Sequence, residues 1–76
     1  MKKNPIITLT TDFGLRDQYA GAMKGAILSV NPGALTVDIS HTITSGDIFE
    51  GAFVMAGACG FYPRGTVHVG VVDPGV

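Results

Sequence analysis

Three short stretches rich in β-branched residues dominate the sequence, and each one ends in a polar residue and a turn. They cover residues 6–11, 35–39 and 67–72, and the intervals between them are long enough for one helix each. Strands that alternate with helices in this way build parallel sheets through right-handed crossovers. The sequence therefore predicts the order βαβαβ, an α/β fold with a parallel sheet.

The third stretch is the first part of the sequence VHVGVVDPGV, which covers residues 67–76. Its valines favour a buried strand that is apolar on both faces. Pro74 lacks an N–H and Gly75 tolerates positive φ, so the strand has to stop and turn there. Asp73 is thereby placed at the carboxyl end of a buried strand, the edge of an open α/β sheet at which ligands bind.

Helical spacing predicts the two connecting helices. For the first helix we expect Asp17 as the N-cap and Asn31-Pro32-Gly33 as the end. Its apolar face consists of Tyr19, Met23, Ala26, Ile27 and Val30. The second helix starts at one of two overlapping capping-box patterns, Thr44-x-x-Asp47 or Asp47-x-x-Glu50, and ends near Gly60. The aromatic side chains of Phe53, Phe61 and Tyr62 are expected in the core.

Composition and charge limit the partners that the protein can bind and the cellular compartment in which it is expected. The formal net charge of −1 gives no basic face, so we expect no nucleic-acid partner. The longest apolar run, residues 52–61, is too short to cross a bilayer, and Lys2-Lys3 is not followed by a secretory segment. A single cysteine, Cys59, excludes an internal disulfide and fits a reducing compartment, so a cytoplasmic location is expected. Residues 1–76 are interpreted as one partial amino-terminal domain of a larger α/β protein, because so short and apolar a chain supports only a small core.

Each predicted strand is followed by a side chain that can carry chemistry: Asp12, His41 and Asp73. In a parallel sheet these three strand ends lie along one edge, so the groups can converge. Aspartates at strand exits also serve as turn or cap residues, and that role stays open for Asp12 and Asp73. For His41 a hydrogen-bonded structural role is favoured over a catalytic one. The sequence has no GxGxxG, P-loop, CxxC or HExxH pattern, so no phosphate-bound cofactor and no metal site are expected.

Five short motifs, in order and at matching spacing, carry a resemblance that covers essentially the whole chain. They are Thr11-Asp12-Phe13-Gly14, Gly21-Ala22-Met23-Lys24-Gly25, Val37-Asp38-Ile39-Ser40-His41, Glu50-Gly51-Ala52 and Val72-Asp73-Pro74-Gly75-Val76. Together they resemble the amino-terminal part of the S-adenosyl-L-methionine hydrolase (adenosine-forming) family, also called SAM hydroxide adenosyltransferases. The resemblance implies the amino-terminal part of a larger Rossmann-like domain.

The resemblance also implies a reaction and an assembly. Members of that family split S-adenosyl-L-methionine with water into adenosine and L-methionine, with no cofactor. They are related to enzymes that use fluoride or chloride at the same carbon. They are homotrimers whose sites lie between the amino-terminal domain of one subunit and the carboxyl-terminal domain of a neighbour.

Residue roles are implied by position in the motifs. Asp12 corresponds to the aspartate that binds the ribose hydroxyls, and Asp73 to the aspartate of an Asp-Arg-His set that orients and polarises the attacking water. The fluoride-using relatives have a tyrosine at the equivalent of Asp73 and a bulky aromatic residue near the equivalent of Gly46. The resemblance therefore implies hydroxide rather than halide as the nucleophile. No catalytic role for His41 is implied.

The Arg and His partners of Asp73 are expected downstream of it, beyond the 76 residues of this sequence. The 76 residues alone are accordingly expected to be a fragment without activity. Two alternatives remain: a non-catalytic module that binds a nucleoside or S-adenosyl-L-methionine, and a structural fragment without a ligand.

Overall fold

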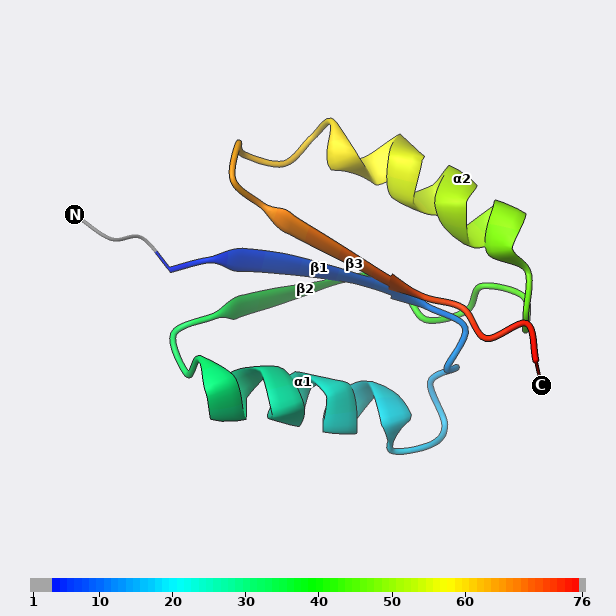
Figure 1. The fold of residues 1–76 in the computed structure, drawn as a ribbon, viewed down its shortest axis with the longest axis horizontal. Coiled ribbons are helices and arrows are strands. Elements are labelled where there is room, and N and C mark those ends of the chain that lie inside the picture. Colours follow the sequence, from blue (N-terminus) through cyan, green and yellow to red (C-terminus); the bar gives the residue numbers. More distant parts are fainter. Residues whose placement is uncertain (1–3, 76) are drawn as a thin grey trace.

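The described part of the chain folds into a three-stranded parallel sheet with one helix on each face (Figure 1). The computed structural model describes residues 4–75. The elements are β1 (Ile6–Thr11), α1 (Tyr19–Val30), β2 (Leu35–Ser40), α2 (Ile48–Cys59) and β3 (Val67–Val71). The predicted βαβαβ order and parallel pairing are confirmed. Lys2-Lys3 and the last motif residue, Val76, lie outside the described residues.

The sheet is organised around β1, which lies between β2 and β3. Its last four residues, from Thr8 to Thr11, are all buried. The expectation that β3 is the buried strand is wrong, because β3 pairs on one side only and Val67 is 50% exposed. Within residues 4–75, β3 has only β1 as a neighbour, so its other backbone edge stays open. A high content of β-branched residues does not change this.

A register shift interrupts the pairing of β1 with β2. Leu9 pairs with Asp38, but Thr10 pairs with Ser40, so Ile39 is an extra residue on β2. An extra residue of this kind re-aims the side chains that follow it. Alternation alone would place Asp38 and His41 on opposite faces of the strand, and the shift brings them to the same side.

The two helices begin differently. Asp47 is the N-cap of α2, and its side chain accepts a hydrogen bond from the backbone N–H of Glu50 at 2.9 Å. This confirms the second of the two predicted patterns. The Glu50 carboxylate in turn accepts a hydrogen bond from the backbone N–H of Thr44 at 3.2 Å. Asp17 was wrongly predicted as the cap of α1, because Gln18 occupies that position and makes no side-chain capping bond.

Much of the apolar surface of the helices faces outward. Helix α2 packs on the sheet, and a Cβ added at Gly51 would lie only 2.9 Å from Val72 Cγ2, so the helix approaches closely there. The expected core positions Phe53 and Phe61 are 80% and 89% exposed, and α1 has no buried residue. The core positions expected for Phe53 and Phe61 are therefore wrong, whereas Tyr62 is half-buried, because three strands offer too little area to cover all the apolar side chains.

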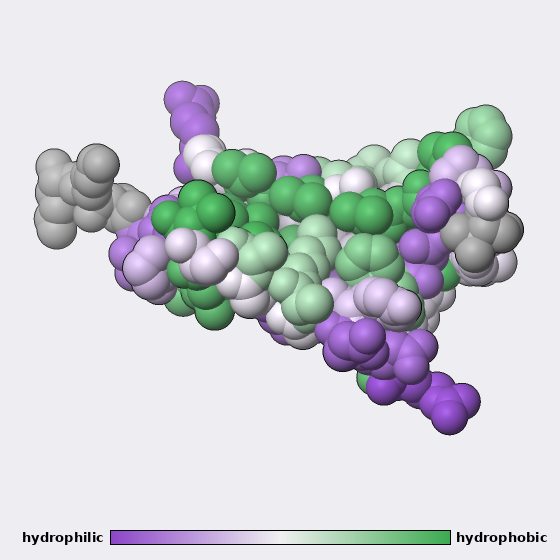
Figure 2. All heavy atoms as spheres, turned by 60° about the horizontal axis from the view of Figure 1, so that its bottom comes forward, coloured by the Kyte–Doolittle hydropathy of each residue, from purple (hydrophilic) through white to green (hydrophobic). Residues whose placement is uncertain are grey.

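The α1 side of the molecule carries a continuous apolar band. Figure 2, which turns this side toward the viewer, shows a hydrophobic strip along the long axis between more hydrophilic ends. Part of it is a groove between α1 and the sheet, lined by Ile7, Ala26, Ile27, Val30 and Asn31. Within residues 4–75, neither helix has the length and apolar character needed to span a membrane.

We predict that the 76 residues, produced alone, self-associate. One edge of β3 has no strand partner within residues 4–75, and aromatic side chains such as Phe49, which is 89% exposed, face outward; both features favour association of chains. Sedimentation velocity over a range of concentrations should show species larger than the monomer. A monomer that unfolds cooperatively at every concentration would contradict this prediction.

Candidate functional site

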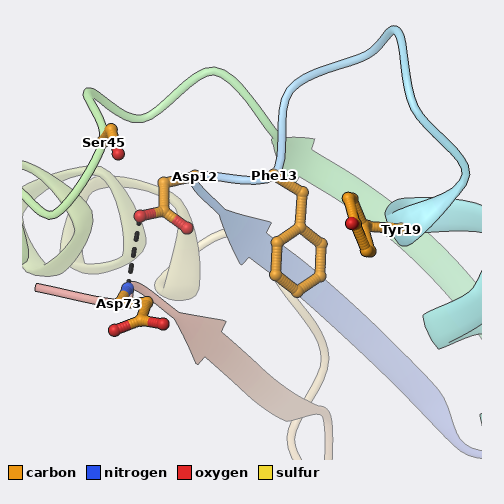
Figure 3. Close-up of a pocket in the computed structure, with 5 residues that line it drawn as sticks. All are labelled: Asp12, Phe13, Tyr19, Ser45 and Asp73. Atoms are coloured by element: carbon orange, nitrogen blue, oxygen red, sulfur yellow. Dashed lines mark hydrogen bonds between the residues drawn. The ribbon is translucent and has the colours of Figure 1, made fainter. Parts of the chain in front are cut away.

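The carboxylate of Asp12 lies at the point where the three strand exits meet. Its Oδ2 atom accepts a hydrogen bond from the backbone N–H of Gly46 at 2.9 Å and a second one from the backbone N–H of Asp73 at 3.2 Å. Figure 3 shows the second of these contacts, between the ends of β1 and β3. One carboxylate oxygen therefore joins three segments that are far apart in the sequence.

These contacts favour the ionised form of Asp12. The hydrogen bond from Gly46 lowers the pKa of the Asp12 carboxyl most, desolvation opposes it, and the hydrogen bond from Asp73 lowers it further, so that the pKa lies below its usual value. Because the pKa is depressed in the folded chain, the stabilisation is present above the pKa of the unfolded chain. It is lost as the pH falls through the lower, folded-state pKa. At neutral pH the carboxylate is a full acceptor.

Asp73 lies beside Asp12 and is exposed. Its Oδ1 atom accepts a hydrogen bond from the backbone N–H of Gly75 at 2.9 Å, which closes the turn after β3. The turn role that the sequence left open is thus present. Its other carboxylate oxygen, Oδ2, has no hydrogen-bond partner within residues 4–75 and is available to a bound molecule.

A pocket of about 360 Å³ opens at this edge of the sheet. Figure 3 shows the five lining residues: Asp12, Phe13, Tyr19, Ser45 and Asp73. The rings of Phe13 and Tyr19 lie 6.2 Å apart at an angle of 51° and form an aromatic wall opposite the carboxylates. The pocket thus combines two acidic acceptors with an apolar surface, which suits a ligand with hydroxyl groups and a flat or apolar part.

Sequence reasoning missed three of the lining residues. Tyr19 was assigned to the apolar face of the helix, although its position at the first residue of α1 could have placed it near the strand exits. Phe13 lies in the turn directly after Asp12, and its position next to that candidate site residue could have predicted that it lines the pocket. Ser45 lies in a loop and carried no recognisable pattern.

His41 lies beneath the site and does not line the pocket. Its side chain is almost fully buried, with Nδ1 2.6 Å from Thr11 Oγ1 and Nε2 2.8 Å from Asp38 Oδ1. The hydrogen bonds expected for His41 from the sequence are confirmed. Of the three predicted strand-exit groups, the structure brings Asp12 and Asp73 together and places His41 behind them.

Gly46 allows the loop before α2 to approach the Asp73 segment. Its φ of 76° lies in the left-handed region, and a Cβ at this position would lie 3.3 Å from Pro74 Cα and 3.5 Å from the Asp73 carbonyl oxygen. Any side chain here would both strain the backbone and reach the turn that carries Asp73. In residues 4–75, no three His, Cys, Asp or Glu side chains are grouped so as to hold a metal ion.

Comparison with known proteins places this geometry in a family. A relative from Methanocaldococcus jannaschii, named (R)-S-adenosyl-L-methionine hydrolase, is 49% identical over an alignment of 75 residues that covers 93% of this chain and 28% of the relative. A relative from an Actinoplanes species, named fluorinase, is 38% identical over 71 residues, 93% of this chain and 24% of the relative. The chain thus spans less than a third of the length of these relatives.

A solved structure shares the fold. The crystal structure of an uncharacterized conserved protein from Thermotoga maritima superposes with a TM-score of 0.85 and 37% sequence identity, covering 93% of this chain and 27% of that protein. The family described as the SAM hydroxide adenosyltransferase N-terminal domain matches residues 7–76. With a match over nearly all of its length, the chain belongs to the SAM hydroxide adenosyltransferase N-terminal domain family.

Proposed function

We propose that this chain supplies one wall of a site at which S-adenosyl-L-methionine reacts with water to give adenosine and L-methionine. The observation that carries the proposal is the meeting of Asp12 and Asp73 in one pocket of a chain whose relatives include enzymes named as (R)-S-adenosyl-L-methionine hydrolases. The names of those relatives favour the (R) form as substrate. The proposal concerns the natural polypeptide at its full encoded length.

The proposed reaction is a displacement at the C5′ carbon of the ribose. A water oxygen forms a bond to C5′ while the bond from C5′ to the positively charged sulfur breaks, and its electron pair leaves with the sulfur as neutral methionine. The attacking water loses one proton. Displacement of this kind depends on holding the nucleophile, the carbon and the leaving sulfur in line.

Each carboxylate has a free oxygen that suits its proposed role. Asp12 is fixed through Oδ2, and its Oδ1 has no hydrogen-bond partner within residues 4–75, so it can accept from the ribose hydroxyls. Asp73 is fixed through Oδ1, and its Oδ2 can accept a hydrogen bond from a water and take up its proton as attack proceeds. Binding and water activation are thus divided between two neighbouring side chains.

Gly46 supports water rather than halide as the nucleophile. It lies against the backbone of Asp73 and Pro74, where a bulky side chain could not fit without moving that turn. The Asp73 carboxylate beside it lines the pocket, where it can accept a hydrogen bond from a water but repels a halide anion. The fluorinase relatives show that this family also includes enzymes named for another nucleophile, so the choice has to be measured.

The proposal also includes the assembly in which the site is completed and the cellular location of the protein. The pocket is open, and the chain spans only 28% of the Methanocaldococcus relative, which supports a site completed by other parts of the polypeptide or by a neighbouring subunit. A homotrimer and a cytoplasmic location are the expected setting.

The proposal is tested by incubating the natural polypeptide with S-adenosyl-L-methionine and separating the products. Adenosine and methionine should form in equal amounts, without a requirement for fluoride or chloride. Formation of a halogenated nucleoside only when halide is added would replace hydrolysis with halide transfer. Tight binding without any product would favour a non-catalytic binding module.

Replacing Asp73 by Asn should slow turnover with little loss of binding. The amide oxygen can still accept from the Gly75 N–H, so the turn is kept while the proton acceptor is removed. Positioned acid–base groups contribute roughly 10²–10⁴ in rate, and we expect a loss of that order. Single-turnover rates and calorimetric affinity separate the two effects. Parent-like turnover by Asp73→Asn would contradict the proposed role.

Replacing Asp12 by Ala should do the opposite and weaken binding. The change removes the acceptor for the ribose and also both backbone contacts. Losing charge-assisted hydrogen bonds of this kind corresponds to roughly ten- to hundredfold in affinity. Asp12→Asn, which keeps one oxygen as an acceptor, is the matched control and should lose less. Equal affinity of Asp12→Ala and the parent would remove Asp12 from the binding site.

Replacing Gly46 by Ala should disturb the site, and Gly65→Ala provides the control. Both glycines have positive φ, so both variants lose about 1–2 kcal/mol from backbone strain. Only at Gly46 does the added Cβ meet neighbouring atoms, because nothing lies within 4 Å at Gly65. Thermal unfolding should therefore show a loss of stability for both variants, larger for Gly46→Ala, while calorimetry should show weaker binding for Gly46→Ala alone. Weaker binding by both variants would indicate a general effect of destabilisation.

A further inference from the structure

A chain of hydrogen bonds runs from α1 through β2 to the end of β1 without touching the pocket. Lys24 Nζ lies 2.6 Å from Asp38 Oδ2, and Asp38 Oδ1 lies 2.8 Å from His41 Nε2. His41 Nδ1 then lies 2.6 Å from Thr11 Oγ1. The proposed chemistry uses none of these four side chains. They nevertheless connect helix α1 and strand β2 to Thr11, the residue directly before Asp12.

The register shift in β2 makes this chain of contacts possible. The extra residue, Ile39, brings Asp38 and His41 to the same side of the strand, and it sets His41 beside Thr11. Both His41 and Thr11 are buried, with exposures of 4% and 0%. A buried polar pair of this kind is costly unless every donor and acceptor is matched, so its geometry is narrowly fixed.

The contacts determine where the protons lie. The carboxylate of Asp38 is an acceptor only, so the Nε2–H of His41 donates to it. The backbone N–H of Phe13 donates to Thr11 Oγ1 at 3.1 Å, so the Thr11 hydroxyl is free to donate its own proton to Nδ1. The contact with Asp38 therefore places a proton on His41 Nε2, and Nδ1 can accept from the Thr11 hydroxyl.

The same residues fix the backbone of the turn that presents Asp12. The Asp12 N–H donates to the carbonyl oxygen of Val71 at 3.2 Å, and the Gly14 N–H donates to the carbonyl oxygen of His41 at 2.6 Å. With the Phe13 N–H on Thr11 Oγ1, all three amides of the turn have defined acceptors. Two of these three acceptors belong to the pair formed by His41 and Thr11.

We propose that His41 is a positioning residue which, through Thr11, aims the Asp12 carboxylate at the backbone N–H groups of Gly46 and Asp73. His41 does not line the pocket. Its effect on substrate affinity rests on the proposed function, whereas its effect on the direction of the Asp12 carboxylate does not.

The structure offers a matched control for this pair. Thr8 Oγ1 lies 2.7 Å from His68 Nδ1, so β1 carries a second Thr–His hydrogen bond, this one to β3. Thr8 is 1% exposed, as deeply buried as Thr11. Removing the Thr8 hydroxyl should cost stability without reorienting Asp12.

The experiment compares Thr11→Val, Thr11→Ser and Thr8→Val in the natural polypeptide at its full encoded length. The pKa of the Asp12 carboxyl is measured by carbon NMR, and affinity is measured calorimetrically with S-adenosyl-L-methionine and with adenosine. Thr11→Val should raise the pKa of Asp12 toward its usual value, because the Gly46 hydrogen bond that lowers it is weakened. Affinity should fall by roughly tenfold. Thr11→Ser, which keeps the hydroxyl, and Thr8→Val should stay near the parent on both measurements.

Three results would overturn the proposal. One is an unchanged Asp12 pKa in Thr11→Val, and another is an equal change in Thr8→Val, which would indicate general destabilisation. The third is nitrogen NMR of the parent showing His41 protonated at Nδ1 rather than Nε2, a measurement that needs no variant to fold. If the parent fails to bind S-adenosyl-L-methionine, the proposed function fails, and the Asp12 pKa and the His41 tautomer still decide this inference.

Discussion

The arrangement of the site depends on one carboxylate oxygen, Oδ2 of Asp12, which accepts two backbone hydrogen bonds from distant segments. Backbone N–H groups at loop ends need acceptors, and a negatively charged oxygen is a stronger one than a carbonyl. By satisfying the amides of Gly46 and Asp73 together, Asp12 holds the loop before α2 and the turn after β3 against the end of β1. The pocket exists because these three segments are held at one point.

Residues of the five sequence motifs contact one another around the strand exits at which Asp12 lies. Asp12 of the first motif meets Asp73 of the last, while Lys24 of the second binds Asp38 of the third. Gly51 of the fourth lets α2 approach Val72. Each motif thus contributes a residue to one connected set of contacts around the strand exits. Their joint presence and spacing follow from that shared geometry.

Element order and the meeting of Asp12 with Asp73 could be predicted, because β-branched runs and turn residues are local signals and parallel strands end at one edge. The placement of β1 rather than β3 at the sheet centre could not, because pairing order depends on tertiary packing. The outward direction of Phe53 and Phe61 was missed for the same reason. The position of His41 depends on the extra residue at Ile39, which strand alternation does not reveal.

The central claim is that Asp12, in its ionised form, ties the amides of Gly46 and Asp73 to the end of β1. An NMR titration toward acidic pH, following the amide proton shifts of both residues and the carboxyl carbon of Asp12, tests it most directly. All three signals should change together, with one midpoint below the usual pKa of an aspartate carboxyl. Amide shifts of Gly46 and Asp73 that do not follow the protonation of Asp12, or a midpoint at the usual value, would contradict the account.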